Sequence, residues 1–273
     1  MLHKIKSLQQ ICENYDQIQL KLNWDLLENG MEEDQILTHY EHDQLVGFLG
    51  IYDFGNKIEL CGMVHPEFRR KGIFTHLAKN AFDLCKKNKG KTILLNAPAN
   101  SITAKQFLAN IPCTLTQTEL QMQWMETTLF SDKNVVVRPA VDEDDAFQIQ
   151  LDVDCFQFTY NDAEQFHHRL KTDPNHQYYM IEYNGERVGK IRVFHDRKDA
   201  WIYSFAILPS MQGKGIGKKA LSNVILNEKN LGYRIFLEVD ATNTNALKLY
   251  ETCGFKTIQA QDYYEYKMEL LHH

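Results

Sequence analysis

The chain has 273 residues, of which 44% are hydrophobic and 24% charged, so it can form two ordinary globular domains. A formal net charge of −6 argues against nucleic acid as its main partner. No apolar run approaches the roughly 18 residues that span a bilayer, so we expect no membrane partner. The first residues carry acids and glutamines where a signal peptide would be apolar, and we therefore expect a cytoplasmic protein.

The six cysteines are scattered, with no CxxC pair and no clustered Cys/His spacing. This pattern argues against a disulfide framework and against a structural zinc site. It is typical of a protein from a reducing compartment. We therefore expect no metal.

The first half of the chain predicts a strand at LVGFLGIY (45–52) and a proline turn with a glycine loop at MVHPEFRRKGIF (63–74). A helix pattern follows at 75–87, and then a short apolar strand at 92–97. The same four elements recur in the same order about 143 residues later. AILPSMQGKGIG (206–217) repeats the loop, between the strand RVGKIRVF and a second helix and strand. Such a repeat predicts a duplicated domain.

The join between the copies is expected near 126–134, because strand-like segments lie on both sides. This gives predicted domains at 1–130 and 131–273. The second is expected to contain a strand at 135–140, two helices within 143–171, strands near 177–183, 187–195 and 200–208, a helix at 214–230, a strand at 234–240, a helix at 244–252 and two final strands within 255–269. The acids Asp142 to Asp145 are expected to cap the first of these helices. The fold class is thus α/β, with helices on the faces of a mixed sheet.

The loop of the second copy is the first chemical signal. Gly213, Gly215 and Gly217 remove side chains that would keep a bulky anion away from the backbone, and a helix start follows. A pyrophosphate, such as that of coenzyme A, is the ligand that we expect this loop to bind. The order of residues does not match a P-loop, a dinucleotide fingerprint or a kinase glycine loop. A structural turn without a ligand would also explain the loop.

A second motif helps to decide between a pyrophosphate-binding loop and a structural turn. LEVDATNTNALKLYETCGF (237–255) contains Asn243, Ala246, Leu249, Tyr250 and the pair Gly254-Phe255. Together with the loop Q-G-K-G-I-G, it resembles the GNAT superfamily of N-acetyltransferases over about 135 residues of the C-terminal half. The resemblance implies two tandem GNAT-like domains. Each would have a mixed, mostly antiparallel sheet with splayed central strands flanked by helices.

The resemblance also implies a donor, acetyl-CoA, and the residues that hold it. Backbone groups of one splayed strand would bind the thioester and the pantetheine arm, the loop would bind the pyrophosphate, and one asparagine would order the last helix. These cofactor-binding residues are Phe205, Ala206, Ile207, Gln212, Gly213, Lys214, Gly215, Ile216, Gly217, Lys218 and Asn243. An N-cap role alone would also explain Asn243.

Tyr250 matches the family's general acid, which protonates the coenzyme A thiolate, although an isolated tyrosine would more simply be a core residue. Glu238 lies twelve residues earlier, a spacing similar to that in bacterial enzymes that acetylate the N-terminus of a ribosomal protein. It is the predicted general base. Asp240, a water chain, or a solvent-facing role for Glu238 are the alternatives.

The first copy matches the motif only in outline. Asn96 stands where the second copy has Glu238, Leu108 where it has Tyr250, Ser101 where it has Asn243, and Phe74 where it has Gly217. We therefore expect a degenerate first copy, as in tandem members such as mycothiol synthase.

The sequence thus predicts an N-acetyltransferase that moves an acetyl group to a primary amine on a small molecule or a peptide N-terminus. The alternative is a non-catalytic acyl-CoA sensor or assembly module.

Overall fold

A computed structural model describes residues 1–29, 31–54, 57–86, 90–130 and 132–267. By its contacts the chain divides into two compact units. The first unit is Met1–Glu119 together with the chain from Gln259 onward, and the second unit is Leu120–Ile258. The domains 1–130 and 131–273 remain a prediction about the duplicated sequence.

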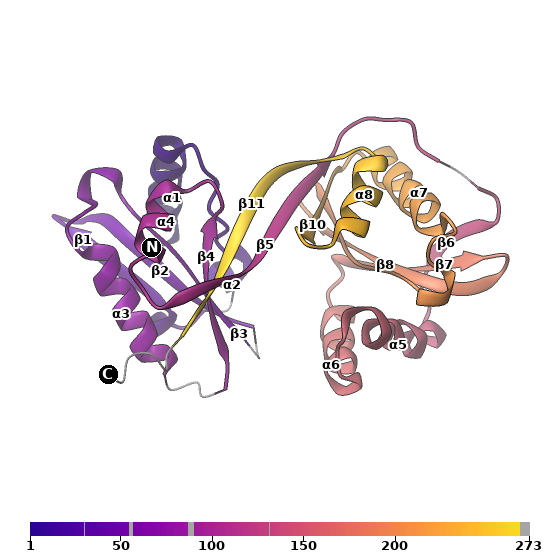
Figure 1. Ribbon diagram of the computed structural model, residues 1–273, viewed down its shortest axis with the longest axis horizontal. Helices are drawn as coiled ribbons and strands as arrows, with labels where there is room; N and C mark the ends of the chain where they lie inside the picture. Colours follow the sequence, from indigo (N-terminus) through magenta and orange to yellow (C-terminus); the bar gives the residue numbers. More distant parts are fainter. Residues whose placement is uncertain (30, 55–56, 87–89, 131, 268–273) are drawn as a thin grey trace. The chain divides into compact units, whose positions relative to one another are not determined.

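The first unit contains most of the elements before residue 120 (Figure 1). In chain order they are α1 (Leu2–Asp16), α2 (Trp24–Asn29), β1 (Ile36–Glu41), β2 (Gln44–Asp53), β3 (Lys57–Val64), α3 (Ile73–Cys85), β4 (Thr92–Pro98), α4 (Ile102–Leu108) and the start of β5 (Cys113–Trp124).

The second unit continues from the end of β5. Its elements are β6 (Val135–Pro139), α5 (Asp145–Phe156), α6 (Tyr160–Lys171), β7 (His176–Tyr183), β8 (Glu186–Asp196), β9 (Asp199–Ile207), α7 (Ile216–Asn230), β10 (Arg234–Asp240), α8 (Thr244–Thr252) and the start of β11 (Phe255–Tyr266). The prediction of two final strands is wrong. FKTIQAQDYYEY has no glycine or proline to form a turn, and it runs as the single strand β11.

The repeat is visible in the turns. The hairpin β7–β8 turns at Asn184-Gly185, and both residues have positive φ (53° and 84°), as a type I′ turn requires. The corresponding hairpin β1–β2 turns at His42-Asp43, again with positive φ at both positions. The two copies therefore share backbone conformation where their side chains differ.

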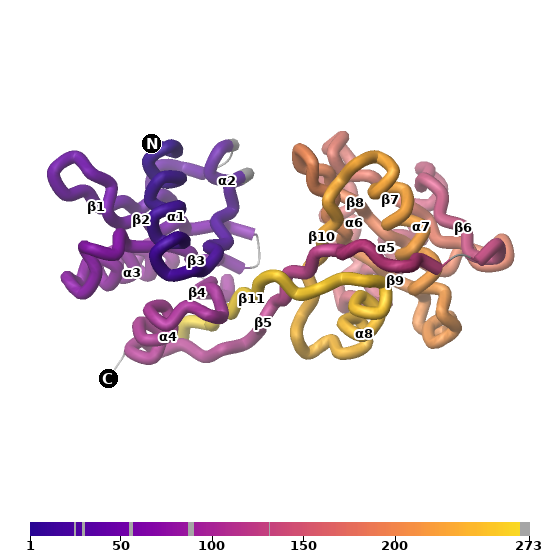
Figure 2. Tube along the Cα trace, turned by 90° about the horizontal axis from the view of Figure 1, so that it is seen from above, coloured from indigo at the N-terminus to yellow at the C-terminus, as the bar shows by residue number. Residues whose placement is uncertain are grey.

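The sheet is mixed and mostly antiparallel, as predicted. The pairs β3–β4 and β9–β10 are parallel, whereas β1–β2, β2–β3, β4–β11, β6–β7, β7–β8 and β8–β9 are antiparallel. The strand order is β1-β2-β3-β4-β11-β5 in the first unit and β11-β5-β10-β9-β8-β7-β6 in the second. The long strands β5 and β11 lie side by side, and each contributes one part to each unit (Figures 1 and 2).

Helices cover both faces of the sheet in each unit. In the first, α3 packs on one apolar cluster (with Ile73, Leu77 and Phe82), and α1 packs on another. In the second, α7 covers the main cluster through Ile216, Ala220 and similar residues, while α5 and α6 lie on the opposite face (Figure 1). Because side chains alternate along a strand, β9, which contacts both helices, presents one set of residues to α7 and the other to α5.

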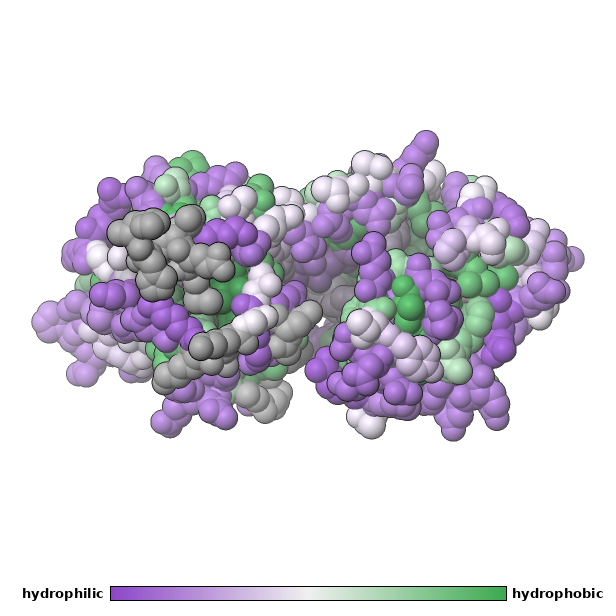
Figure 3. All heavy atoms as spheres, turned by 60° about the horizontal axis from the view of Figure 1, so that its bottom comes forward, coloured by the Kyte–Doolittle hydropathy of each residue, from purple (hydrophilic) through white to green (hydrophobic). Residues whose placement is uncertain are grey.

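Hydrophilic residues cover much of the face that Figure 3 shows. Within the described residues, no helix is long and apolar enough to cross a membrane.

Candidate active site

The glycine loop of the second unit is held in a fixed conformation. Gly213 and Gly215 both have φ of 75°, in the left-handed region, and a Cβ placed on either would meet no atom within 4 Å. Gly215 is the N-cap of α7. The Gln212 side chain donates to the Ile207 carbonyl oxygen at 2.9 Å, which ties the loop to the end of β9. The loop thus presents an open backbone surface at a helix N-terminus, where anions are favoured.

The neighbouring strands diverge beside this loop. The parallel pairing of β9 with β10 runs from Asp199↔Arg234 to Ile202↔Leu237, although β9 continues to Ile207 and β10 to Asp240. On its other edge, β9 shifts register against β8 near Ser204, whose φ is 47°. Backbone groups beyond Ile202 are therefore available to a partner other than β10. Phe205, Ala206 and Ile207 lie in this diverging part.

The predicted acid and base lie on consecutive elements. Glu238 is half-buried on β10, and because Leu237 and Val239 pack under α7, its side chain belongs to the α5 face. Tyr250 lies on α8, packs against the main apolar cluster, and meets the Phe255 ring edge-on at 6.0 Å between centroids.

Burial raises the pKa of Tyr250 to about 12, so its phenol keeps its proton at neutral pH. Asn243 is the N-cap of α8, and its side chain accepts from the Ala246 N–H at 3.1 Å. Asp240, the alternative base, accepts a hydrogen bond from the Thr242 N–H at 2.7 Å and so organises the turn into that helix.

The two lysines of the loop region make local contacts. The Lys214 ammonium lies 3.2 Å from the Met211 sulfur, and the Lys218 ammonium lies 3.5 Å from the centroid of the Phe130 ring. Ile216, Gly217 and Lys218 form the first turn of α7.

The loop of the first unit has the same backbone features as the loop of the second unit, but different side chains. Arg69 Nε donates to the Val64 carbonyl oxygen at 3.0 Å, as Gln212 does in the second unit, and Gly72 caps α3 with φ of 79°. Arg69 also forms two hydrogen bonds with Asp16, at 2.6 and 2.8 Å. Arg70 takes the left-handed position that Gly213 fills in the second copy, with φ of 65°.

The central strands of the first unit diverge as well. The pairing of β3 with β4 stops at Leu60↔Leu95, but the register of β2 with β3 is continuous, without the shift seen near Ser204. The Phe74 ring packs edge-to-face against the Phe107 ring, with 4.8 Å between the centroids. Leu108, at the position of Tyr250, is buried.

A cavity of about 580 Å³ lies within the first unit, a feature that the sequence did not reveal. Leu60, Phe74 and Leu95 are among its lining residues, as is Asn96. The Asn96 carboxamide is buried, and neither its oxygen nor its nitrogen has a hydrogen-bond partner in the described part of the chain.

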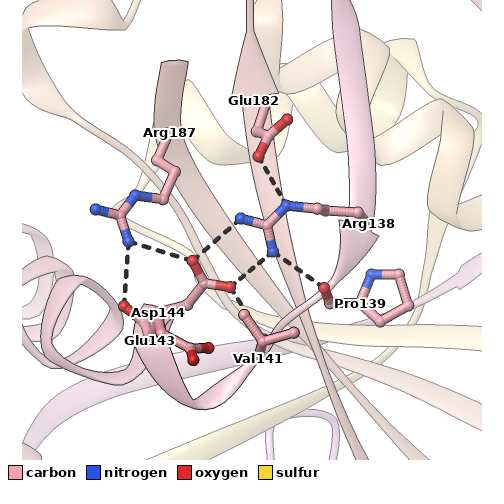
Figure 4. Close-up of polar contacts among 7 residues, drawn as sticks. All are labelled: Arg138, Pro139, Val141, Glu143, Asp144, Glu182 and Arg187. Atoms are coloured by element: carbon pink, nitrogen blue, oxygen red, sulfur yellow. Dashed lines mark hydrogen bonds and ion pairs between the residues drawn. The ribbon is translucent and has the colours of Figure 1, made fainter. Parts of the chain in front are cut away.

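An ion-pair network fixes the start of α5 in the second unit (Figure 4). Arg138 donates to Asp144 at 2.7 Å and to Glu182 at 2.7 Å, and Arg187 donates to Asp144 at 3.3 Å. Asp144 also accepts from the Val141 N–H at 3.0 Å. The hydrogen bonds from Arg138 lower the pKa of Asp144 to about 2. Of the acids expected to cap this helix, Asp144 caps the short turn Asp142–Asp144 through the Val141 N–H, whereas its side chain makes no capping hydrogen bond to α5.

The described residues contain no group of three or more His, Cys, Asp or Glu side chains that could hold a metal ion. The cysteines are all free, and burial raises the thiol pKa of several, including Cys253 near Tyr250.

The model of the acetyltransferase (GNAT) family matches the chain twice, at residues 3–108 and 146–255. The chain belongs to this family. Each copy of the repeat matches the family model separately, which confirms two GNAT domains in tandem.

Relatives cover parts of the chain. This chain is 34% identical over 87 residues to the uncharacterized N-acetyltransferase YdgE of Bacillus subtilis, and the match spans 30% of this chain and 55% of that protein. It is 39% identical over 66 residues to the mycothiol acetyltransferase of Renibacterium salmoninarum, spanning 24% of this chain and 20% of that one. The chain therefore spans little more than half the length of the first of these relatives, and a smaller share of the second.

Solved structures match almost the whole fold. A GCN5-related N-acetyltransferase from Sphaerobacter thermophilus has a TM-score of 0.82 at 17% identity, over 96% of this chain and 91% of that one. A tandem GNAT protein from the clavulanic acid biosynthesis pathway has a TM-score of 0.62 at 14% identity, over 83% of this chain and 80% of that one. At these identities, the likeness shows the fold alone.

Proposed function

We propose that the second unit transfers an acetyl group from acetyl-CoA to a primary amine, in a cytoplasmic enzyme that needs no metal. The observation that carries this proposal is the junction of the open glycine loop with the diverging strands β9 and β10. The loop can bind a pyrophosphate through the N–H groups of Gln212 to Gly217, while the free edge of β9 can pair with an amide-bearing arm.

The amine attacks the thioester directly, with no covalent acyl-enzyme intermediate. The amine nitrogen attacks the thioester carbonyl carbon, a C–N bond forms, and the C–S bond breaks. Glu238 takes a proton from the amine, directly or through a water, and Tyr250 gives its phenolic proton to the departing thiolate. A backbone N–H among Phe205 to Ile207 would stabilise the developing oxyanion; such donors contribute about 2.7–4 kcal/mol in acyl-transfer enzymes.

The first unit is proposed to be catalytically silent. It has Asn96 and Leu108 at the acid–base positions, and its β2–β3 register lacks the shift that accompanies the divergence in the second unit. Asn96 cannot act as a base, because a carboxamide does not accept a proton at neutral pH.

Calorimetry of acetyl-CoA binding tests the donor site. Gly215→Glu places a negative side chain at the start of α7 and should weaken binding at least tenfold. Gly185→Glu is the matched control: it adds the same charge at an equally open left-handed position, φ 84°, but in the β7–β8 turn. It should bind acetyl-CoA as the parent does. Parent-like binding by Gly215→Glu would contradict the proposed site.

A further inference from the structure

The α5 face of the second unit carries two buried cations. Lys190 and Arg192 alternate along β8 with Ile191 and Val193, which face the opposite core under α7, and the two cations are only 3% and 6% exposed. Lys190 is fully engaged on α5: its ammonium lies 2.6 Å from the Asp152 carboxylate and donates to the Gln148 carbonyl oxygen at 2.9 Å.

Arg192 has no comparable partner. Its Nη1 lies 2.7 Å from His176 Nδ1, and its Nε is buried without a hydrogen-bond partner. The rings of Tyr203 and Phe166 lie 4.9 and 5.8 Å from the guanidinium carbon. No carboxylate among the described residues forms an ion pair with it.

The neighbours of Arg192 do not neutralise it. Burial and the guanidinium itself lower the pKa of His176 to about 4, so the imidazole is neutral and accepts the hydrogen bond. Asp152 on α5, a carboxylate that acts electrostatically on Arg192, is paired with Lys190. A buried charge is costly unless it is paired, and the Nε of the buried Arg192 has no hydrogen-bond partner in the described part of the chain, so this guanidinium favours an anionic ligand.

Arg192 is also aligned with the proposed base. It pairs across the sheet with Tyr203, and Ile202, the residue before Tyr203, pairs with Leu237, the residue before Glu238. Arg192, Tyr203 and Glu238 thus form a row across three adjacent strands on one face. Tyr203 and Glu238 directly follow the last paired residues of β9 and β10, where the two strands diverge.

We infer that the acceptor is an amine that also carries a carboxylate, that Arg192 binds this carboxylate, and that the amine thereby lies at Glu238. The inference rests on the proposed function and deepens it. A guanidinium whose Nε lacks a hydrogen-bond partner can donate to a single planar carboxylate. A phosphate dianion fits less well, since the other buried cation is already paired. Arg192 is a binding residue in this scheme, while Tyr203 supports the guanidinium through its ring.

The test compares amino acids with their matched carboxamides as probes. Binding is measured by calorimetry on protein loaded with coenzyme A, where no transfer occurs, and turnover is measured by thiol release from acetyl-CoA. The parent should prefer the carboxylate of at least one pair by about 10- to 100-fold. Carboxamide amines are less basic and more often neutral, so this bias acts against the expected result.

Arg192→Met should remove the preference, and Arg192→Lys, which keeps the charge, should retain part of it. Arg197→Met is the control, since Arg197 is exposed in the β8–β9 turn; it should behave as the parent does. All three variants should bind acetyl-CoA normally, which also shows that they fold.

Two results would overturn the inference: equal binding of carboxylate and carboxamide by the parent for every pair, or a full preference in Arg192→Met. The proposed function can fail separately. If carboxylate binding depends on Arg192 but no amine releases thiol, the carboxylate site at Arg192 stands, whereas the transfer reaction and the role of the ligand as its acceptor are wrong.

Discussion

Replacing two nearby glycines of the glycine loop by alanine should change the stability of the protein in opposite directions. Gly215 has φ of 75°, and an added Cβ there would touch nothing within 4 Å, so the cost of Gly215→Ala is conformational rather than steric. A left-handed residue with a side chain costs roughly 1–2 kcal/mol. Gly217 has a helical φ, and its added Cβ would make ordinary contacts at 3.5–3.7 Å. Gly217→Ala should therefore stabilise the helix by roughly 0.5–1 kcal/mol.

The two variants should thus lie on opposite sides of the parent in urea unfolding. With an m-value of about 2 kcal/mol/M, the midpoint should fall by about 0.5–1 M for Gly215→Ala and rise by about 0.3–0.5 M for Gly217→Ala. Tryptophan fluorescence is the natural probe, because Trp124 and Trp201 both lie in the second unit. Equal midpoints for the two variants would refute the assigned loop conformation.

Three further predictions concern other parts of the molecule. Arg70→Gly should stabilise the first unit by about 1 kcal/mol in urea unfolding, because glycine relieves the left-handed backbone at that position; a loss of stability would contradict this. Asp144→Asn should cost about 2 kcal/mol at pH 7. That deficit should shrink as the pH falls from about 4 to 2, since the low pKa of Asp144 stabilises the fold only while the carboxylate is charged, and a deficit independent of pH would be incompatible with it. Tyr250→Phe should lower kcat at least roughly tenfold with little change in acetyl-CoA affinity, and Glu238→Gln should recover partly at high pH; parent-like kcat in the tyrosine variant would leave Tyr250 a core residue.

Local patterns in the sequence predicted much of the second unit. The Gly213/Gly215 spacing, the Asn243 cap and the order of strands and helices depend on residues close in the chain, and the structure shows each of them. The charged residues Lys190 and Arg192 in the apolar strand RVGKIRVF were a signal that the sequence analysis passed over: two cations on one face of a central strand need partners.

What the sequence did not predict depends on pairing between distant segments. The division of β5 and β11 between the two units is set by which strand edges meet, and no local motif encodes this. The cavity beside Asn96 likewise arises from side chains of α1, β3, β4 and α4, which are far apart in the chain. That Arg192 lacks a carboxylate partner depends on the pairing of Asp152 with Lys190, which joins α5 to β8 and is not encoded in a local pattern.

The most direct test of the central claim is amine-dependent thiol release from acetyl-CoA by two matched variants. Gly72→Glu and Gly215→Glu make the same change at equivalent caps, with φ of 79° and 75° and open space around each, in the first and second copy. We expect Gly215→Glu to lose at least roughly tenfold in kcat/KM and Gly72→Glu to retain the parent's activity. Loss of activity in Gly72→Glu with full activity in Gly215→Glu would place the chemistry in the first unit and contradict the account.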